Sequence, residues 1–138
     1  MIAPFVLDAS VTAAWCFSDE ATPASTALQN SLTERTAIVP VLWHTESANL
    51  LILAERRGRI SAAQCAELVE RLEDLLIETD PETAHVGGPI VRLARRYQLT
   101  IYDAVYLELA IRRGVELATR DQALIRAAQE EKVRIIPT

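Results

Sequence analysis

Short apolar runs alternate with longer amphipathic segments along the whole chain. The apolar runs predict short buried strands at 5–7, 37–39, 77–79, 115–118 and 133–136. Helices are expected between them, at about 10–17, 23–35, 41–57, 62–76, 80–97, 101–113 and 121–130. This alternation is typical of an α/β fold, with a central parallel sheet of about 4–5 short strands flanked by about seven α-helices in three α/β/α layers.

Local signals support several of the helix boundaries. Thr22 with Pro23 is typical of a helix start, and Ser61–Gln64 forms a capping box. Gly58 is placed to end the helix before it. The Gly-Gly-Pro sequence at 87–89 should break or bend the 80–97 helix near its start.

Length and composition indicate a self-sufficient core. The chain has 138 residues, half of them hydrophobic, which fits one domain spanning 1–138 without structural disulfides. Cys16 and Cys65 are expected to be free and to fill apolar positions. No apolar run is long enough to cross a membrane, and residues 1–8 do not resemble a signal peptide, so a cytoplasmic location is expected.

Charge is unevenly distributed along the chain. The net charge is −5, which by itself argues against non-specific binding of nucleic acid. Seven acids and one base lie between positions 67 and 82, whereas arginines gather at 56–59, 92–96 and 112–126. Arginine pairs well with phosphate, but solvated helix faces explain the same clusters equally well, and both interpretations stay open.

Four carboxylates stand out by their positions. Asp8 follows the first predicted strand, and Asp121 follows the strand at 115–118 after a two-residue turn. Asp103 lies in the first turn of an apolar helix. Because parallel strands end at the same edge of a sheet, we expect these side chains to converge there.

Glu46 lies on a different kind of element. At helical spacing it shares one face with Leu42, Asn49 and Leu53, which places a carboxylate and an amide on an apolar stripe. Burying an unpaired carboxylate costs on the order of several kcal/mol, so a partner for Glu46 is expected. That partner is either a metal ion or an arginine that forms a salt bridge with Glu46.

Each of the three aspartates also has a structural alternative. Each could cap or support the start of a helix. Ser10 could replace Asp8 in that role, and Thr119 with Gln122 could replace Asp121, which would leave both acids available for chemistry.

Several carboxylates near one point repel one another unless a cation joins them. Hard oxygen ligands favour Mg²⁺ or Mn²⁺, and carboxylate-bound magnesium commonly engages phosphate substrates. The predicted chemistry is therefore metal-assisted hydrolysis of a phosphodiester.

These residues resemble the PIN-domain ribonucleases, and among them the VapC toxins of bacterial type II toxin–antitoxin systems. The resemblance rests on five short motifs and their order: Val6–Ser10, Glu46, Asn49, Tyr102–Ala104 and Thr119–Asp121. It implies a parallel-sheet nuclease whose acids converge on one or two magnesium or manganese ions.

The resemblance also implies roles for single residues. The acidic metal site would comprise Asp8, Glu46, Asp103 and Asp121. The small polar positions beside it would be Ser10, Asn49 and Thr119. Such toxins cut RNA, commonly transfer RNA, to halt translation. They usually form homodimers, and a cognate VapB-type antitoxin silences them by filling the active-site groove.

Three other functions compete with this interpretation. Phosphoryl-transfer folds of the haloacid-dehalogenase or receiver type also place an aspartate after the first strand, but they need a nearby lysine, and Lys132 is the only one here. A PIN-fold nuclease outside a toxin–antitoxin module would carry the same acids. A non-catalytic interaction module would use them only as helix caps.

Overall fold

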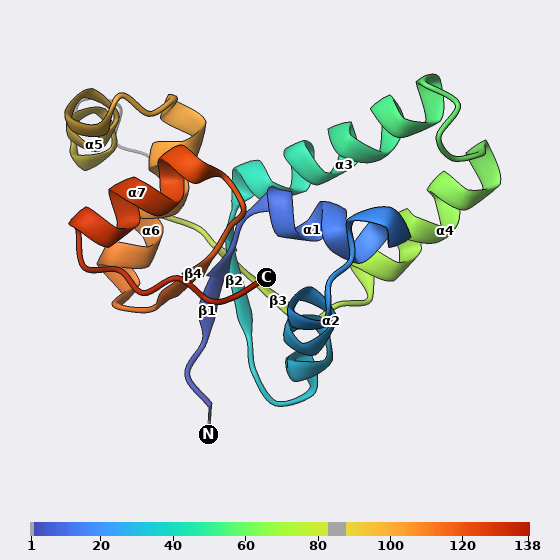
Figure 1. The fold of residues 1–138 in the computed structure, drawn as a ribbon, viewed down its shortest axis with the longest axis horizontal. Helices are drawn as coiled ribbons and strands as arrows, with labels where there is room; N and C mark the ends of the chain where they lie inside the picture. The colour runs from blue at the N-terminus through green and yellow to red at the C-terminus, as the bar shows by residue number, and fades with distance from the viewer. Residues whose placement is uncertain (1, 83–87) are drawn as a thin grey trace.

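The computed structural model describes residues 2–82 and 88–138. Four strands form one fully parallel sheet in the order β3-β2-β1-β4 (Figure 1). Their bounds are β1 Phe5–Leu7, β2 Ala37–Pro40, β3 Ile77–Asp80 and β4 Glu116–Ala118. The two central strands are apolar and fully buried, which is the pattern of a parallel sheet covered on both faces.

The predicted strand at 133–136 is the exception. Only an isolated bridge joins Leu117 to Ile135 beside β4. Lys132 has a positive φ of 60°, and Pro137 lacks an N–H, so only a few residues between them can pair. The segment completes the edge of the sheet without forming a strand.

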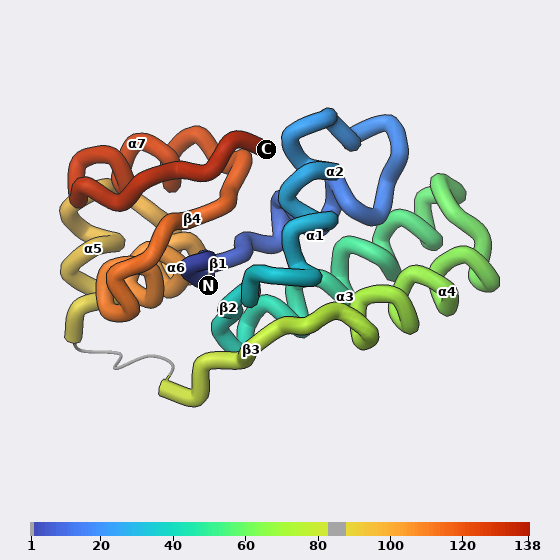
Figure 2. Tube along the Cα trace, turned by 90° about the horizontal axis from the view of Figure 1, so that it is seen from below, coloured from blue at the N-terminus to red at the C-terminus, as the bar shows by residue number. Residues whose placement is uncertain are grey.

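Seven α-helices lie within the described residues. Their bounds are α1 Ala9–Cys16, α2 Pro23–Asn30, α3 Val41–Arg56, α4 Ala62–Glu73, α5 Pro89–Tyr97, α6 Ile101–Arg113 and α7 Gln122–Glu130. Two 3₁₀ turns follow α1 and α2, at Ser18–Glu20 and Ser31–Thr33. Helices α5, α6 and α7 lie on one side of the sheet and α1 to α4 on the other (Figures 1 and 2). The predicted α/β/α arrangement is confirmed.

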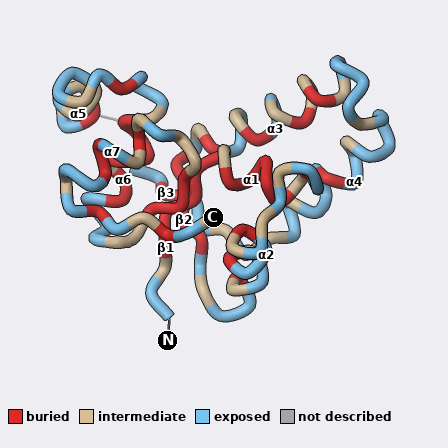
Figure 3. The backbone as a smooth tube through the Cα atoms, in the orientation of Figure 1, coloured by how far each residue is buried: buried red, intermediate tan, exposed pale blue. Residues whose placement is uncertain are grey.

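The core follows the sheet. Buried positions concentrate in the strands and on the helix faces turned toward them, while the outer sides of α4 and α5 are exposed (Figure 3). Helix α6 packs against three strands and buries Ala104 to Leu107. A second, smaller cluster joins α1, α3 and α4 through Phe17, Leu51 and Leu68, and Cys16 and Cys65 lie partly buried against it.

The local capping signals are largely confirmed. Thr22 and Ser61 each accept a hydrogen bond from the backbone three residues ahead and complete a capping box. Gly58 and Gly114 adopt left-handed φ values of 73° and 63°, a conformation that glycine adopts at little cost.

Three helix predictions were wrong in detail. Helix α2 ends at Asn30, and a 3₁₀ turn replaces the predicted continuation to 35. Asp80 ends β3 instead of opening a helix, and α5 begins at Pro89. The glycine at 87 lies outside the described residues. The predicted helix 62–76 ends at Glu73 as α4; its apolar pattern predicts that Val69 and Leu76 face inward, but Val69 is 37% exposed and Leu76, beyond the end of the helix, is 69% exposed.

No helix in the described ranges 2–82 and 88–138 has the length and apolar character needed to cross a membrane.

Candidate active site

Asp8 lies where β1 passes into α1. Strands β1 and β4 run side by side with Leu7 opposite Ala118, and the Asp8 amide donates to the Ala118 carbonyl at 3.0 Å. The carboxyl ends of both strands therefore meet here, as predicted. Only 6% of Asp8 is exposed.

Two hydroxyl groups hold the Asp8 carboxylate. Oδ2 accepts hydrogen bonds from Ser10 Oγ at 2.6 Å and from Thr119 Oγ1 at 2.7 Å. The Arg120 amide donates to Ser10 Oγ at 2.9 Å, which connects α1 to the turn after β4. Burial raises the pKa of Asp8 against the lowering effect of these hydroxyls, and the nearby charge of Asp121 raises it further. The carboxylate is thus fixed in position, and no basic side chain of the described residues forms an ion pair with it.

Glu46 is held by a buried tyrosine. Tyr106, fully buried on α6, donates from its hydroxyl to Glu46 Oε1 at 2.6 Å. Burial raises the pKa of Glu46, the hydrogen bond from Tyr106 lowers it, and the charge of Asp8 raises it. The alternative interpretation, a salt bridge to an arginine, is not found within the described residues.

The predicted apolar stripe on α3 needs correction. The buried face of this helix runs through Trp43, Ser47, Leu51 and Ala54. Glu46 is half-buried at the margin of that face, and Asn49 is exposed. The stripe is rotated because the large Trp43 side chain inserts into the core and donates to Thr12 at 2.9 Å.

Asp103 lies in the first turn of α6, where the Thr100 hydroxyl accepts from the Asp103 amide at 3.1 Å. The apolar sequence around Asp103 predicts a buried helix start, but the first two helical residues, Ile101 and Tyr102, are 47% and 61% exposed, and full burial begins only after Asp103. Burial raises the pKa of Asp103 to about 6, and the charges of Asp121, Asp8 and Glu46 add to the effect. The other three acids therefore lie close enough to Asp103 for their charges to raise its pKa.

Asp121 has the structural role that was considered as an alternative. It is the N-cap of α7, and its Oδ1 accepts from the Leu124 amide at 2.9 Å. The expected capping box of Thr119 with Gln122 does not form, because the Thr119 hydroxyl donates to Asp8 and accepts from the Asp121 amide at 3.1 Å. Thr119 instead links two of the acids.

The donor atoms of this site suit a divalent cation, but as they are placed they do not form a complete set of ligands. Within the described residues, no three Asp, Glu, His or Cys side chains lie close enough together to hold an ion as they stand. The donors are nevertheless hard carboxylate oxygens, and none of the four acids has a basic partner in an ion pair among the residues that the structure describes. Carboxylates that raise one another's pKa and have no basic partner favour a cation nearby.

Tyr106 contacts the candidate site but was not among the residues predicted from the sequence. It lies three residues after Asp103, on nearly the same face of α6, so one helix carries Asp103 and also donates a hydrogen bond to Glu46. The spacing was visible in the sequence, but a tyrosine within an apolar run is indistinguishable from ordinary core.

Glu46→Gln is expected to raise the melting temperature of the metal-free protein at pH 7. The raised pKa shows that the fold disfavours the charged carboxylate, and glutamine keeps an oxygen that accepts from Tyr106. Thermal unfolding in EDTA measures the change, with Glu70→Gln on the exposed side of α4 as the matched control. A lower melting temperature for Glu46→Gln would show that the ionised form stabilises the fold.

The pH dependence of stability should report Asp103. Its pKa of about 6 in the folded protein lies above the value of about 3.9 for an unfolded aspartate, so its contribution to stability is complete below pH 4 and lost as the pH rises through 6. Metal-free Asp103→Asn should therefore gain stability relative to wild type between about pH 4 and pH 7. Urea unfolding at several pH values tests this, and a constant difference would contradict it.

Comparison with known proteins identifies the fold. The model of the PIN domain family matches residues 5–130. PAE2754 from Pyrobaculum aerophilum has a similar structure, with a TM-score of 0.76 and 21% identity over 97% of this chain and 90% of that chain. FitAcB from Neisseria gonorrhoeae is also similar, with a TM-score of 0.63 and 16% identity over 96% of each chain. No curated protein matches the sequence. At these identities the two structures indicate a shared fold, and the family match over most of the chain shows that it belongs to the PIN domain family, whose members are generally nucleases.

Proposed function

We propose that this protein is a magnesium- or manganese-dependent endoribonuclease, acting as the VapC-type toxin of a toxin–antitoxin module. The observation that carries the proposal is the group of uncompensated carboxylates where the carboxyl ends of β1 and β4 meet. The family supplies the nuclease fold, and the sequence resemblance to VapC toxins supplies the cellular role.

Asp8 and Asp103 are the acids best suited to hold the cation, with Glu46 and Asp121 completing the acidic group. A bound divalent ion would lower the pKa of a water molecule and stabilise charge on the leaving oxygen of the phosphodiester. Ser10 and Thr119 fix the orientation of the Asp8 carboxylate through short hydrogen bonds. Tyr106 fixes the orientation of Glu46 in the same way, through a hydrogen bond of 2.6 Å.

Several finer features follow from the VapC resemblance and belong to the same proposal. The substrate is structured RNA such as transfer RNA, the protein acts in the cytoplasm as a homodimer, and a VapB-type antitoxin inhibits it. Some arginines are unsuited to hold RNA because they are committed to acids: Arg59 to Asp19 and Glu20, and Arg113 to Glu78 and Asp80.

Metal binding separates this proposal from a non-catalytic interaction module with the same fold. Adding Mn²⁺ or Mg²⁺ to the metal-free protein should raise its melting temperature, because a ligand that binds only the folded state stabilises it by about 2.7 kcal/mol at 100 times its dissociation constant. Asp103→Asn should lose most of this effect. Scanning calorimetry measures it, and equal stabilisation of both proteins would place the ion elsewhere.

RNA cleavage completes the test. The wild-type protein should cut a mixed transfer RNA substrate with added Mn²⁺ and should be inactive in excess EDTA. Cleavage that persists in EDTA would exclude the metal-dependent mechanism, and absence of cleavage despite metal-induced stabilisation would exclude this class of substrate.

A further inference from the structure

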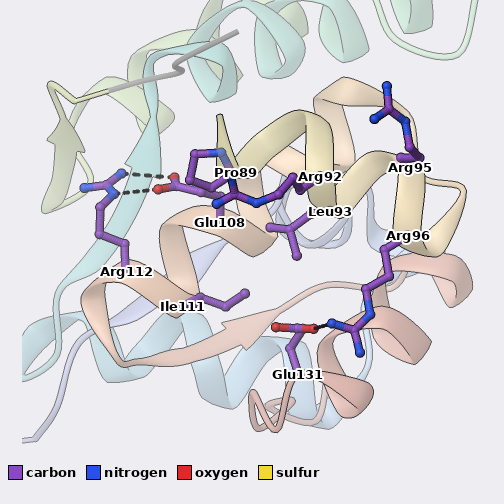
Figure 4. A pocket seen from close by; sticks show the side chains of 9 residues that line it. All are labelled: Pro89, Arg92, Leu93, Arg95, Arg96, Glu108, Ile111, Arg112 and Glu131. Carbon is purple, nitrogen blue, oxygen red and sulfur yellow. Dashed lines mark hydrogen bonds and ion pairs between the residues drawn. The ribbon is translucent and has the colours of Figure 1, made fainter. Parts of the chain in front are cut away.

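A broad groove lies on the far side of α6 from the sheet, between α5, α6 and the end of α7 (Figure 4). Its volume is about 690 Å³. Pro89, Leu93 and Ile111 supply apolar surface, and Ile111 is 40% exposed. Arg92 and Arg95 are both exposed on α5; the Arg92 side chain extends across the groove, whereas the Arg95 side chain points away from the other lining side chains (Figure 4).

The groove is positively charged on a protein whose net charge is −5. Four arginines and two glutamates line it. Both glutamates are already paired, Glu108 with Arg112 at 2.8 Å and Glu131 with Arg96 at 3.5 Å. Arg92 and Arg95 have no ion pair with any residue that the structure describes. Both guanidinium groups are therefore available to an incoming anion, that of Arg92 over the groove and that of Arg95 beside it.

Helix electrostatics alone do not explain this surface. Arg95 and Arg96 lie in the last turn of α5, where cations stabilise the helix dipole. Arg92 lies a turn earlier, outside the range of that effect. Nor does the dipole account for an isoleucine left 40% exposed beside the arginines.

We propose that this groove docks an acidic, amphipathic segment of a partner protein. Carboxylates of the segment would pair with Arg92 and Arg95, and its apolar side chains would cover Leu93 and Ile111. Nucleic acid fits less well, because its phosphates would pair with the arginines but leave the apolar surface of Leu93 and Ile111 uncovered. A second copy of this chain is the alternative occupant, and the oligomeric state of the Ile111→Asn variant tests it.

The proposal does not depend on the nuclease assignment. Asp103 and Arg112 lie nine residues apart on α6, which is about 13 Å along the helix axis. The groove is lined by the later part of α6 and does not include any of the four acids of the candidate active site. A partner can therefore dock here while the acidic site remains free.

A synthetic helical peptide tests the proposal, with leucines on one face and glutamates on the other and a fluorescent label at one end. Anisotropy titration in EDTA should show saturable binding that weakens as salt is added. Arg92→Glu combined with Arg95→Glu should weaken it by about tenfold, equivalent to about 1.4 kcal/mol. Ile111→Asn should weaken it as well. The matched control is Arg56→Glu with Arg57→Glu, exposed at the end of α3, which should bind like wild type.

Four outcomes would overturn the proposal. A peptide of the same composition with its leucines scrambled could bind equally well. The control with Arg56→Glu and Arg57→Glu could lose as much affinity as the variant with Arg92→Glu and Arg95→Glu. A single-stranded RNA oligonucleotide could bind the groove more tightly than the peptide and depend on the same arginines. Finally, sedimentation could show that Ile111→Asn converts a dimer to a monomer, which would assign the groove to a second copy.

Discussion

Asp8→Asn is expected to lower RNA cleavage by at least about 100-fold, equivalent to about 2.7 kcal/mol of transition-state stabilisation. The substitution removes the most buried negative charge of the site, at the junction of β1 and β4. Asparagine keeps an oxygen that can accept from Ser10 and Thr119, so the local hydrogen bonds survive. Single-turnover cleavage of transfer RNA in Mn²⁺ measures the loss.

The control for this experiment is Asp74→Asn, an exposed aspartate after α4 that should cleave like wild type. The melting temperature of metal-free Asp8→Asn should equal or exceed that of wild type, because a carboxylate whose pKa is raised by burial is replaced by a neutral group. Full activity in Asp8→Asn would refute the assigned role. Unfolding of the variant would make Asp8 a structural residue.

Arg112→Ala should lower the free energy of unfolding by about 2 kcal/mol. Arg112 Nη2 lies 2.8 Å from Oδ2 of Asp80, whose side chain is 4% exposed. The more distant contact of Arg113 with Asp80, at 3.3 Å, remains and limits the loss. Urea unfolding at pH 7 measures it, with exposed Arg56→Ala as a control that should change stability by less than about 0.5 kcal/mol.

The pH dependence provides a second check on the same pair. The hydrogen bonds from Arg112 hold the pKa of Asp80 below its usual range, so the stabilisation is present above pH 4 and is lost as the pH falls. The difference between wild type and Arg112→Ala should therefore narrow in acid. A difference that does not change with pH would mean that the loss arises from packing of the arginine stem.

Most of the fold could be predicted from the sequence, because the patterns that specify its strands and helices are local. Apolar triplets at β1 and β2, and capping boxes at Thr22 and Ser61, depend on neighbouring residues, and the structure confirms them. Asp80 was misassigned because aspartate followed by proline is also a common helix start. What decided its place is an ion pair with Arg112, more than thirty residues away, which no local pattern reveals.

The site was only partly predictable, because most of its contacts join residues that lie far apart in the sequence. Strand ends placed Asp8 and Asp121 at one edge of the sheet, since parallel pairing fixes that geometry. The partners of the acids could not be foreseen, because Thr119 turns to Asp8 and Asp121 caps α7, although either could have done the capping. The Tyr106 hydroxyl reaches Glu46 across sixty residues of sequence.

A crystal structure of the protein soaked in Mn²⁺, with anomalous scattering used to locate the ion, examines the acidic site most directly. The expected result is a manganese peak bonded to carboxylate oxygens of Asp8 and at least one of Glu46, Asp103 and Asp121. A peak elsewhere, or none at saturating Mn²⁺, would mean that these acids do not form a metal centre.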